Sequence, residues 1–247
     1  MSHIKNVEAF EKLVGLCAGY GEKYNPAQEN LQVQKSVVML TASRNVLQET
    51  GLAKTNYEKA TNTREVAYTS LNQLAIRVLG ELMSSNVINQ TVNDAKFLLR
   101  KINGIPTRSR LSIPSGIAHA AGEGTFESNK MSRRVAKGLD FGTRAQNFEK
   151  MIQTLVAEQA YRPNISDLKV DSLSSHLQKL RALNLHVVES YSSLSEARKK
   201  RNAMFYKESS NLFSTAQAMK EQVKATFGTK SEAFHEVRKI TFTKPIK

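Results

Sequence analysis

Residues 10–33, FEKLVGLCAGYGEKYNPAQENLQV, and residues 148–170, FEKMIQTLVAEQAYRPNISDLKV, follow one pattern that decides how the chain is organised. Both stretches open on Phe-Glu-Lys and lead to a Tyr-x-Pro turn with two apolar residues behind it. The similarity continues to the end of each half, where the sequence RKI at 100–102 is repeated at 238–240. Internal similarity of this kind indicates that one structural unit is present twice.

Apolar residues in each half recur at spacings of three and four, which is the period of an amphipathic α-helix. Proline and glycine mark the breaks between these periodic segments. For the first half we predict helices over 7–19, 27–50, 54–83 and about 88–102, with an end or a kink at Gly51. For the second half we predict helices that begin near Phe148, Leu173, Met204 and Ser231.

The segment 103–145 interrupts the helical period, because glycine and proline recur along it without a sustained apolar stripe. A structureless stretch of this length is uncommon inside a compact domain and favours a boundary. The predicted fold class is therefore all-α, with two tandem antiparallel four-helix-bundle-like repeats at 1–102 and 146–247. A basic Gly/Pro-containing linker at 103–145 joins them, and the second repeat ends in a short extended tail.

The charge balance is the outstanding feature of the composition. The chain has 36 Lys and Arg residues against 22 Asp and Glu residues, a formal net charge of +14. Such a charge attracts nucleic acid or acidic partners, and it also serves to keep a protein in solution. The lone Cys17 excludes an intrachain disulfide and suits a reducing compartment. With neither a signal peptide nor a membrane span in view, we expect a cytoplasmic protein without membrane contact.

Residues suited to catalysis or to metal binding are sparse. Cys17 falls on the apolar stripe of the first predicted helix, where a small buried side chain is the ordinary role. The five histidines show neither a His-Glu-x-x-His pair nor a spacing matched to cysteine ligands. We therefore predict no catalytic residue, no metal and no cofactor, and a protein that is not an enzyme.

Consecutive cations provide the one candidate binding surface. Four of them follow one another near the end of a predicted helix, and a further pair lies in the linker. Such side chains can contact phosphates, although a charge run is also a common solvated surface. The candidate contacts for an anion or a nucleic acid are Arg198, Lys199, Lys200, Arg201, Arg133 and Arg134.

Arg64 and Arg201 occupy matching places in the two halves, in register with apolar stripes. A cation there must reach solvent or find a partner, because an unpaired buried charge is costly. We expect these structural, repeat-equivalent arginines to make an ion pair or a helix-end contact rather than to form a ligand site.

Four short sequences carry a family resemblance: YNP at 24–26, TNYEKATNTRE at 55–65, RKING at 100–104 and FTKP at 242–245. Together they resemble an uncharacterised family of bacterial two-repeat all-helical proteins that has no assigned activity. The resemblance implies the two-repeat helical architecture and adds no site residues.

These observations favour a non-enzymatic helical scaffold or protein-interaction protein, which binds a protein partner or a second copy of itself. The alternative is a basic protein that associates with nucleic acid at low specificity. Affinity that falls steeply with salt would distinguish the alternative.

Overall fold

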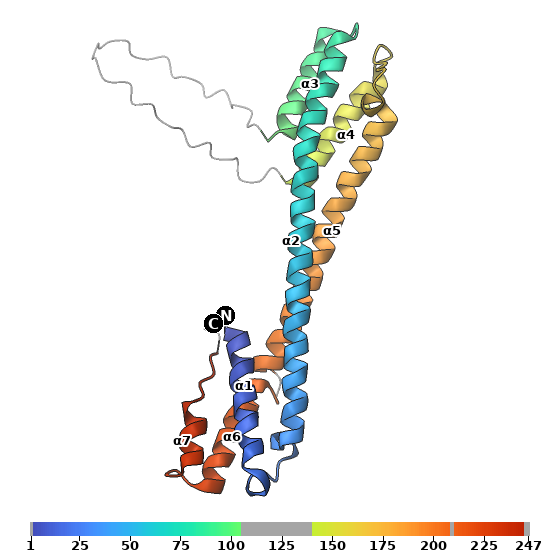
Figure 1. Cartoon of the computed structure of the whole chain (residues 1–247). Helices are drawn as coiled ribbons and strands as arrows, with labels where there is room; N and C mark the ends of the chain where they lie inside the picture. Colours follow the sequence, from blue (N-terminus) through green and yellow to red (C-terminus); the bar gives the residue numbers. More distant parts are fainter. Residues whose placement is uncertain (1, 105–139, 208–209, 245–247) are drawn as a thin grey trace, which may run out of the picture. The chain divides into compact units, whose positions relative to one another are not determined.

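The computed structural model describes residues 2–104, 140–207 and 210–244 (Figure 1). Helices connected by short turns make up this part of the chain, and none of its residues lies in a β-strand. The all-α prediction is therefore confirmed. Most of the predicted linker, residues 105–139, lies outside the described residues, and so do Arg133 and Arg134.

The helices follow the order labelled in Figure 1. The α-helices are α1 (Ser2–Gly19), α2 (Val33–Ser84), α3 (Asn89–Ile102), α4 (Phe141–Ala157), α5 (Val170–Asn202), α6 (Leu212–Phe227) and α7 (Glu232–Lys239). Single 3-10 turns lie at η1 (Gly21–Lys23), η2 (Glu29–Leu31) and η3 (Ser166–Leu168), and a π-helical turn, η4 (Ala203–Lys207), follows α5.

The predicted break at Gly51 is wrong, because α2 is one continuous helix of 52 residues. A glycine inside a helix costs only about 1 kcal/mol relative to alanine, so flanking residues that favour the helix carry it through. The start of this helix also differs from the prediction. Residues 29–31 form the 3-10 turn η2, and α2 begins at Val33.

We expect that Gly51→Ala raises the free energy of unfolding by about 0.5–1 kcal/mol. Gly51 is exposed within α2, and a Cβ atom added there meets no atom within 4 Å. Urea denaturation followed by circular dichroism measures the change. Gly228→Ala is the matched control, because Gly228 has φ +88°, where an alanine is strained, and the same substitution should destabilise. A destabilised Gly51→Ala variant would contradict the prediction.

Helix boundaries in the second half also depart from the prediction. Helix α4 begins at Phe141, so its first residues belong to a stretch that the sequence assigned to the linker. Met204 and Phe205, predicted to start a third helix, lie instead in the π-helical turn η4, and α6 begins at Leu212.

The chain divides into two compact units, and the division falls inside α2 and inside α5. Unit 1 consists of Met1–Lys59 and Val188–Lys247, and unit 2 consists of Ala60–Val187. Each unit thus takes the first part of one predicted repeat and the last part of the other. The side chains that pack together in each unit follow this division.

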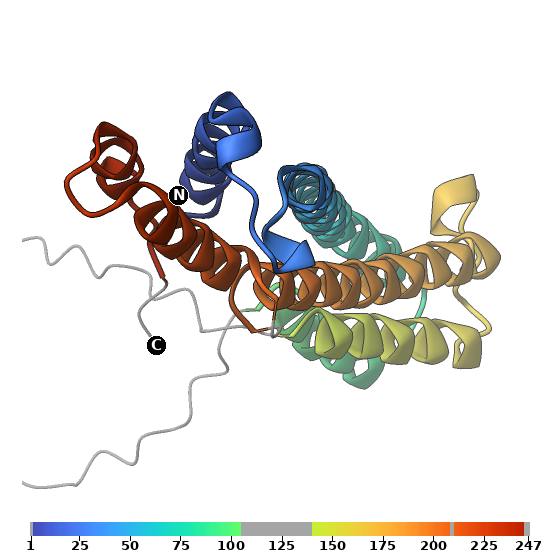
Figure 2. The ribbon, with the colours of Figure 1, turned by 90° about the horizontal axis from the view of Figure 1, so that it is seen from below.

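The core of unit 1 draws on both ends of the chain. Helix α6 lies beside α1 and α7, as the blue and red ribbons in Figure 2 show. The buried apolar residues of this core come from α1 (Phe10, Leu13, Cys17), η2 (Leu31), α2 (Leu40), η4 (Phe205), α6 (Leu212, Met219) and α7 (Val237).

The core of unit 2 is built from the central part of the chain, where α3 packs against α4. Its buried apolar residues come from α2 (Tyr68, Leu71, Leu82), α3 (Ala95, Ile102), α4 (Phe148, Met151), η3 (Leu168) and α5 (Leu173, Leu180).

The same buried hydrogen bond closes the turn before each long helix. In unit 1 the Tyr24 hydroxyl donates to the Leu31 carbonyl oxygen at 3.1 Å. In unit 2 the Tyr161 hydroxyl donates to the Leu168 carbonyl oxygen at 2.8 Å. A buried hydroxyl that lost this acceptor would be left unsatisfied, so both tyrosines fix the path of the turn.

We expect stability to fall as the pH rises from 10 to 12, in part because of Tyr161. Burial, with a smaller contribution from Glu81, raises the pKa of Tyr161 to about 12. The unfolded chain releases this proton near pH 10 while the folded chain keeps it, so the unfolded state gains. Thermal unfolding of Tyr161→Phe should therefore show a shallower loss over this interval. Equal slopes in the variant and the wild type would refute this account.

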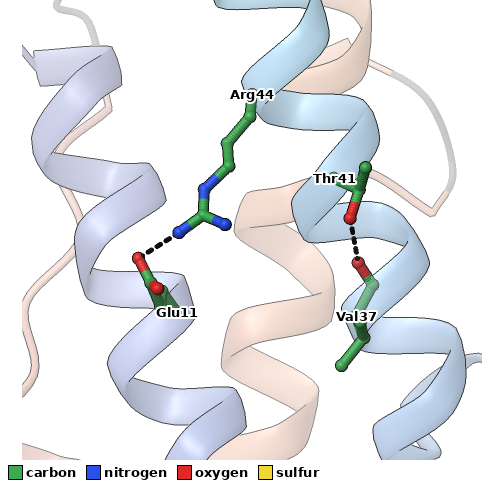
Figure 3. Close-up of polar contacts among 4 residues, drawn as sticks. All are labelled: Glu11, Val37, Thr41 and Arg44. Carbon is green, nitrogen blue, oxygen red and sulfur yellow. Dashed lines mark hydrogen bonds and ion pairs between the residues drawn. The ribbon is translucent and has the colours of Figure 1, made fainter.

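An ion pair joins α1 to α2 on the surface of unit 1 (Figure 3). The Arg44 guanidinium lies 2.5 Å from the Glu11 carboxylate, and both side chains are about half exposed. One turn away, the Thr41 hydroxyl donates to the Val37 carbonyl oxygen within α2. Exposed pairs contribute at most about 1 kcal/mol, so the buried apolar residues are the larger contribution to this packing.

Candidate functional site

The basic cluster, defined as residues 198–201, lies near the end of α5, just before the π-helical turn η4. Arg198, Lys199 and Lys200 are exposed, whereas Arg201 is half-buried. The structure therefore presents three of the four predicted side chains to solvent.

Arg201 is turned toward its own helix end. Its Nε and Nη2 atoms donate to the Asn202 side-chain oxygen at 3.2 and 2.9 Å. Burial lowers the pKa of Arg201, and the neighbouring Arg198 lowers it further. The sequence led us to expect an ion pair or a helix-end contact for Arg201, and the contact described here is with the side-chain amide of its neighbour.

The π-helical turn beside this cluster is held by residues of α1. The ring of His3 lies 5.3 Å from that of Phe205 and 5.6 Å from that of Tyr206, and its Nδ1 atom lies 3.2 Å from the Tyr206 hydroxyl. Asn6 donates to the same hydroxyl at 3.1 Å and to the Thr243 carbonyl oxygen at 2.8 Å. Burial, then Arg201, lowers the pKa of His3. These contacts tie both ends of the chain to η4.

Arg64 has a different environment in unit 2. Its guanidinium carbon lies 4.0 Å from the centre of the Phe141 ring, a cation–π contact. Its Nε atom is buried without a hydrogen-bond partner. The two arginines that the sequence aligned thus have unlike partners, an aromatic ring for Arg64 and an amide for Arg201.

Arg144 makes several hydrogen bonds that the sequence did not predict, because its position was assigned to the linker. It donates to the carbonyl oxygens of Ile102 at 2.8 Å and Tyr68 at 3.1 Å, and to the Asn72 side chain at 2.7 Å. The sequence offset that aligns Phe148 with Phe10 also aligns Arg144 with Asn6. Asn6 likewise donates to a backbone carbonyl oxygen near the end of the second half. The repeat in the sequence therefore offered a signal for the role of Arg144.

The remaining candidate groups are the thiol of Cys17 and side chains that could bind a metal ion. Cys17 is buried, and burial raises the pKa of its thiol to about 11, which keeps it protonated at neutral pH. Within residues 2–104, 140–207 and 210–244, no group of three or more His, Cys, Asp or Glu side chains is placed to hold a metal ion.

An exposed apolar surface was also not anticipated. We call Tyr57, Val188 and Tyr191 the tyrosine patch of unit 1. Val188 and Tyr191 lie three residues apart on α5, so they share a face, and they are 64% and 55% exposed. The Tyr191 ring lies 5.7 Å from the ring of Tyr57 on α2. The patch thus spans two helices of one unit.

Comparisons with family models, with curated proteins and with solved structures find no match to this chain. Among the helices of the described ranges, none is long and apolar enough to cross a membrane.

Proposed function

We propose that this chain is a non-enzymatic helical scaffold or protein-interaction protein, and that it binds a protein partner or a second copy of itself. The observation that carries the proposal is the tyrosine patch of unit 1. Tyr191 and Val188, both more than half exposed, together with the half-buried Tyr57 whose ring contacts that of Tyr191 in a tilted arrangement, form a surface of the kind that proteins bury on association.

The composition of the patch supports this function. Tyrosine is enriched at the energetic centres of interfaces, because a rigid ring buries a large area and keeps a hydroxyl for hydrogen bonding. Tyr191 is already held against Tyr57, so a partner would order few side chains on binding. The patch is suited to contact with an apolar helix face or loop of another protein.

We further propose that the chain contains two tandem copies of one antiparallel helical unit, and that the copies exchange segments so that each compact unit contains parts of both. The paired Tyr–Leu hydrogen bonds and the matched buried phenylalanines, Phe10 and Phe148, support this view. Duplicated helical units present repeated surfaces, as scaffold proteins do.

Light scattering during size-exclusion chromatography, combined with affinity capture from native lysate, tests the interaction function. We expect a dimer or a retained protein with the wild type, and loss of either with the variant Val188→Ser/Tyr191→Ser. The matched control is Val156→Ser, which removes a similarly exposed apolar side chain from α4 of unit 2. A strict monomer that retains no protein would refute the proposal.

The alternative is low-specificity association with nucleic acid, and one observation favours it. Arg198, Lys199 and Lys200 are consecutive, exposed and located at one helix end, in a chain with a net charge of +14. Such a surface can engage phosphates without reading base edges.

Fluorescence anisotropy with a DNA and an RNA oligonucleotide tests this alternative. Each phosphate engaged should add about −0.9 to the slope of log affinity against log salt for duplex DNA. Replacing the three exposed cations with alanine should reduce that slope. Binding that is absent at low salt, or that is insensitive to salt, would eliminate the alternative.

A further inference from the structure

A polar pocket opens in unit 2 between α2 and α5, with the turn η3 at its edge. Its volume is about 500 Å³. That volume is within the range of roughly 300–1,000 Å³ in which proteins bind small molecules. Its lining combines two cations with a carboxylate, hydroxyl, amide and imidazole groups and one leucine: Ser70, Gln73, Leu74 and Arg77 from α2, Asp167 from η3, and Ser172, Ser175, His176 and Lys179 from α5.

The charges of the pocket leave cationic groups available to a ligand. Arg77 lies 3.8 Å from the carboxylate of Asp167, a long contact, and the two side chains are 49% and 69% exposed. Exposed pairs of this kind are weak, so a ligand can exchange with Asp167 for the guanidinium. Lys179 is exposed at the same pocket and adds a second positive charge.

His176 also lines this pocket. Its ring lies edge-on to Phe148, 6.2 Å between centres, and its Nε2 atom is buried without a hydrogen-bond partner. A neutral imidazole offers one N–H donor, and the tautomer with its proton on Nδ1 leaves no unsatisfied donor at the buried Nε2. Burial, then Lys179, lowers the pKa of His176, which agrees with a neutral ring.

Unit 1 shows that the fold does not require these polar residues. Counting from the first residues of α2 and α5, Val33 and Val170, His176 corresponds to Met39 and Lys179 to Ala42. The buried positions of α6 repeat those of α2, with Ala216 matching Ala75, and this register places Ala218 opposite Arg77. Met39 and Ala218 pack against the core of unit 1.

We propose that the pocket of unit 2 binds the phosphate group of a small organic phosphate, with Arg77 and Lys179 as the charged contacts and Ser172, Ser175 and His176 as hydrogen-bond donors. Two cations and several hydroxyl groups match the charge and the oxygen atoms of a tetrahedral dianion. The pocket volume exceeds that of a bare phosphate, which leaves room for the group attached to it. This proposal is independent of the protein-interaction function.

Calorimetric titration of the full chain with glycerol 3-phosphate and with inorganic phosphate tests the site. We expect saturable binding of both probes at one site, with the ester binding more tightly. The decisive variant is Arg77→Ala/His176→Met/Lys179→Ala, which copies the residues of unit 1. It should lose at least about tenfold in affinity, or about 1.4 kcal/mol, while its thermal stability is kept or raised.

Two single variants separate a loss of the binding site from a loss of the fold or of charge in general. If the triple variant fails to fold, Lys179→Gln, at an exposed position, should still weaken binding severalfold. Arg181→Gln removes one cation from unit 2 outside the pocket, where Arg181 pairs with Glu149 at 2.7 Å, and should leave the affinity unchanged. No saturable binding of the ester, an unaffected triple variant, or an equal loss with Arg181→Gln would each overturn the proposal.

Discussion

A chain cut between residues 104 and 140 should remain a single complex. Unit 1 contains α1 and the first part of α2 together with α6 and α7, which lie on the opposite side of such a cut. Unit 2 likewise joins α3 to α4 across it. Two hydrophobic cores would therefore hold the fragments together after the backbone is broken.

The expected strength of this association is large because each core contributes. Fully burying one large apolar side chain is worth about 1.5–3 kcal/mol, and both fragments supply several such residues to each core. Two tandem repeats that each bury their own core would share no such surface and would separate. The experiment therefore distinguishes exchanged packing from independent repeats.

A protease recognition sequence inserted after Gly124 provides the cut. We expect one native peak in size-exclusion chromatography and two bands in a denaturing gel. Urea should separate the fragments in the same transition that unfolds the helices, and that transition should depend on protein concentration. Two native peaks of half mass would contradict the exchanged arrangement.

The substitution Phe148→Ala should lower the free energy of unfolding by about 3–5 kcal/mol. Phe148 lies on α4 with a fully buried side chain in the core of unit 2. Removing the ring deletes its transfer free energy and leaves a cavity that rigid helices cannot fill. Urea denaturation monitored by circular dichroism measures this loss.

Two further variants test whether the loss of core packing causes this destabilisation. Phe10→Ala removes the fully buried ring of α1 in unit 1 and should be comparably destabilising. Val156→Ala, at a position on α4 that is 65% exposed, should change stability by no more than about 0.5 kcal/mol. A Phe148→Ala variant as stable as Val156→Ala would show that the core of unit 2 is not packed as described.

Periodicity predicted which face of each helix is buried, and the apolar stripe of α1 is an example. Val7, Phe10, Val14 and Cys17 follow one another at spacings of three and four in the sequence, and all four are buried. The same pattern cannot say which segment covers that face, because any apolar stripe satisfies it. For this reason the sequence did not predict that α1 packs against α6.

The candidate sites show the same limit. The basic cluster was visible because its residues are consecutive, yet the turn of Arg201 toward Asn202 depends on where α5 ends. The pocket of unit 2 was missed because Arg77 lies about a hundred residues before His176 and Lys179. Only the packing of α2 on α5 brings their side chains to one opening.

During translation the two units become complete at different times. Unit 2 is one uninterrupted stretch, so its core can form as soon as residue 187 has left the ribosome. Unit 1 joins α1 to α6 and α7, so the apolar stripe of α1 is not covered until residues more than 190 positions later in the chain have been made. Contacts between such distant segments form slowly, and exposed apolar surface invites chaperones. The nascent α1 is therefore the segment that most needs protection during translation.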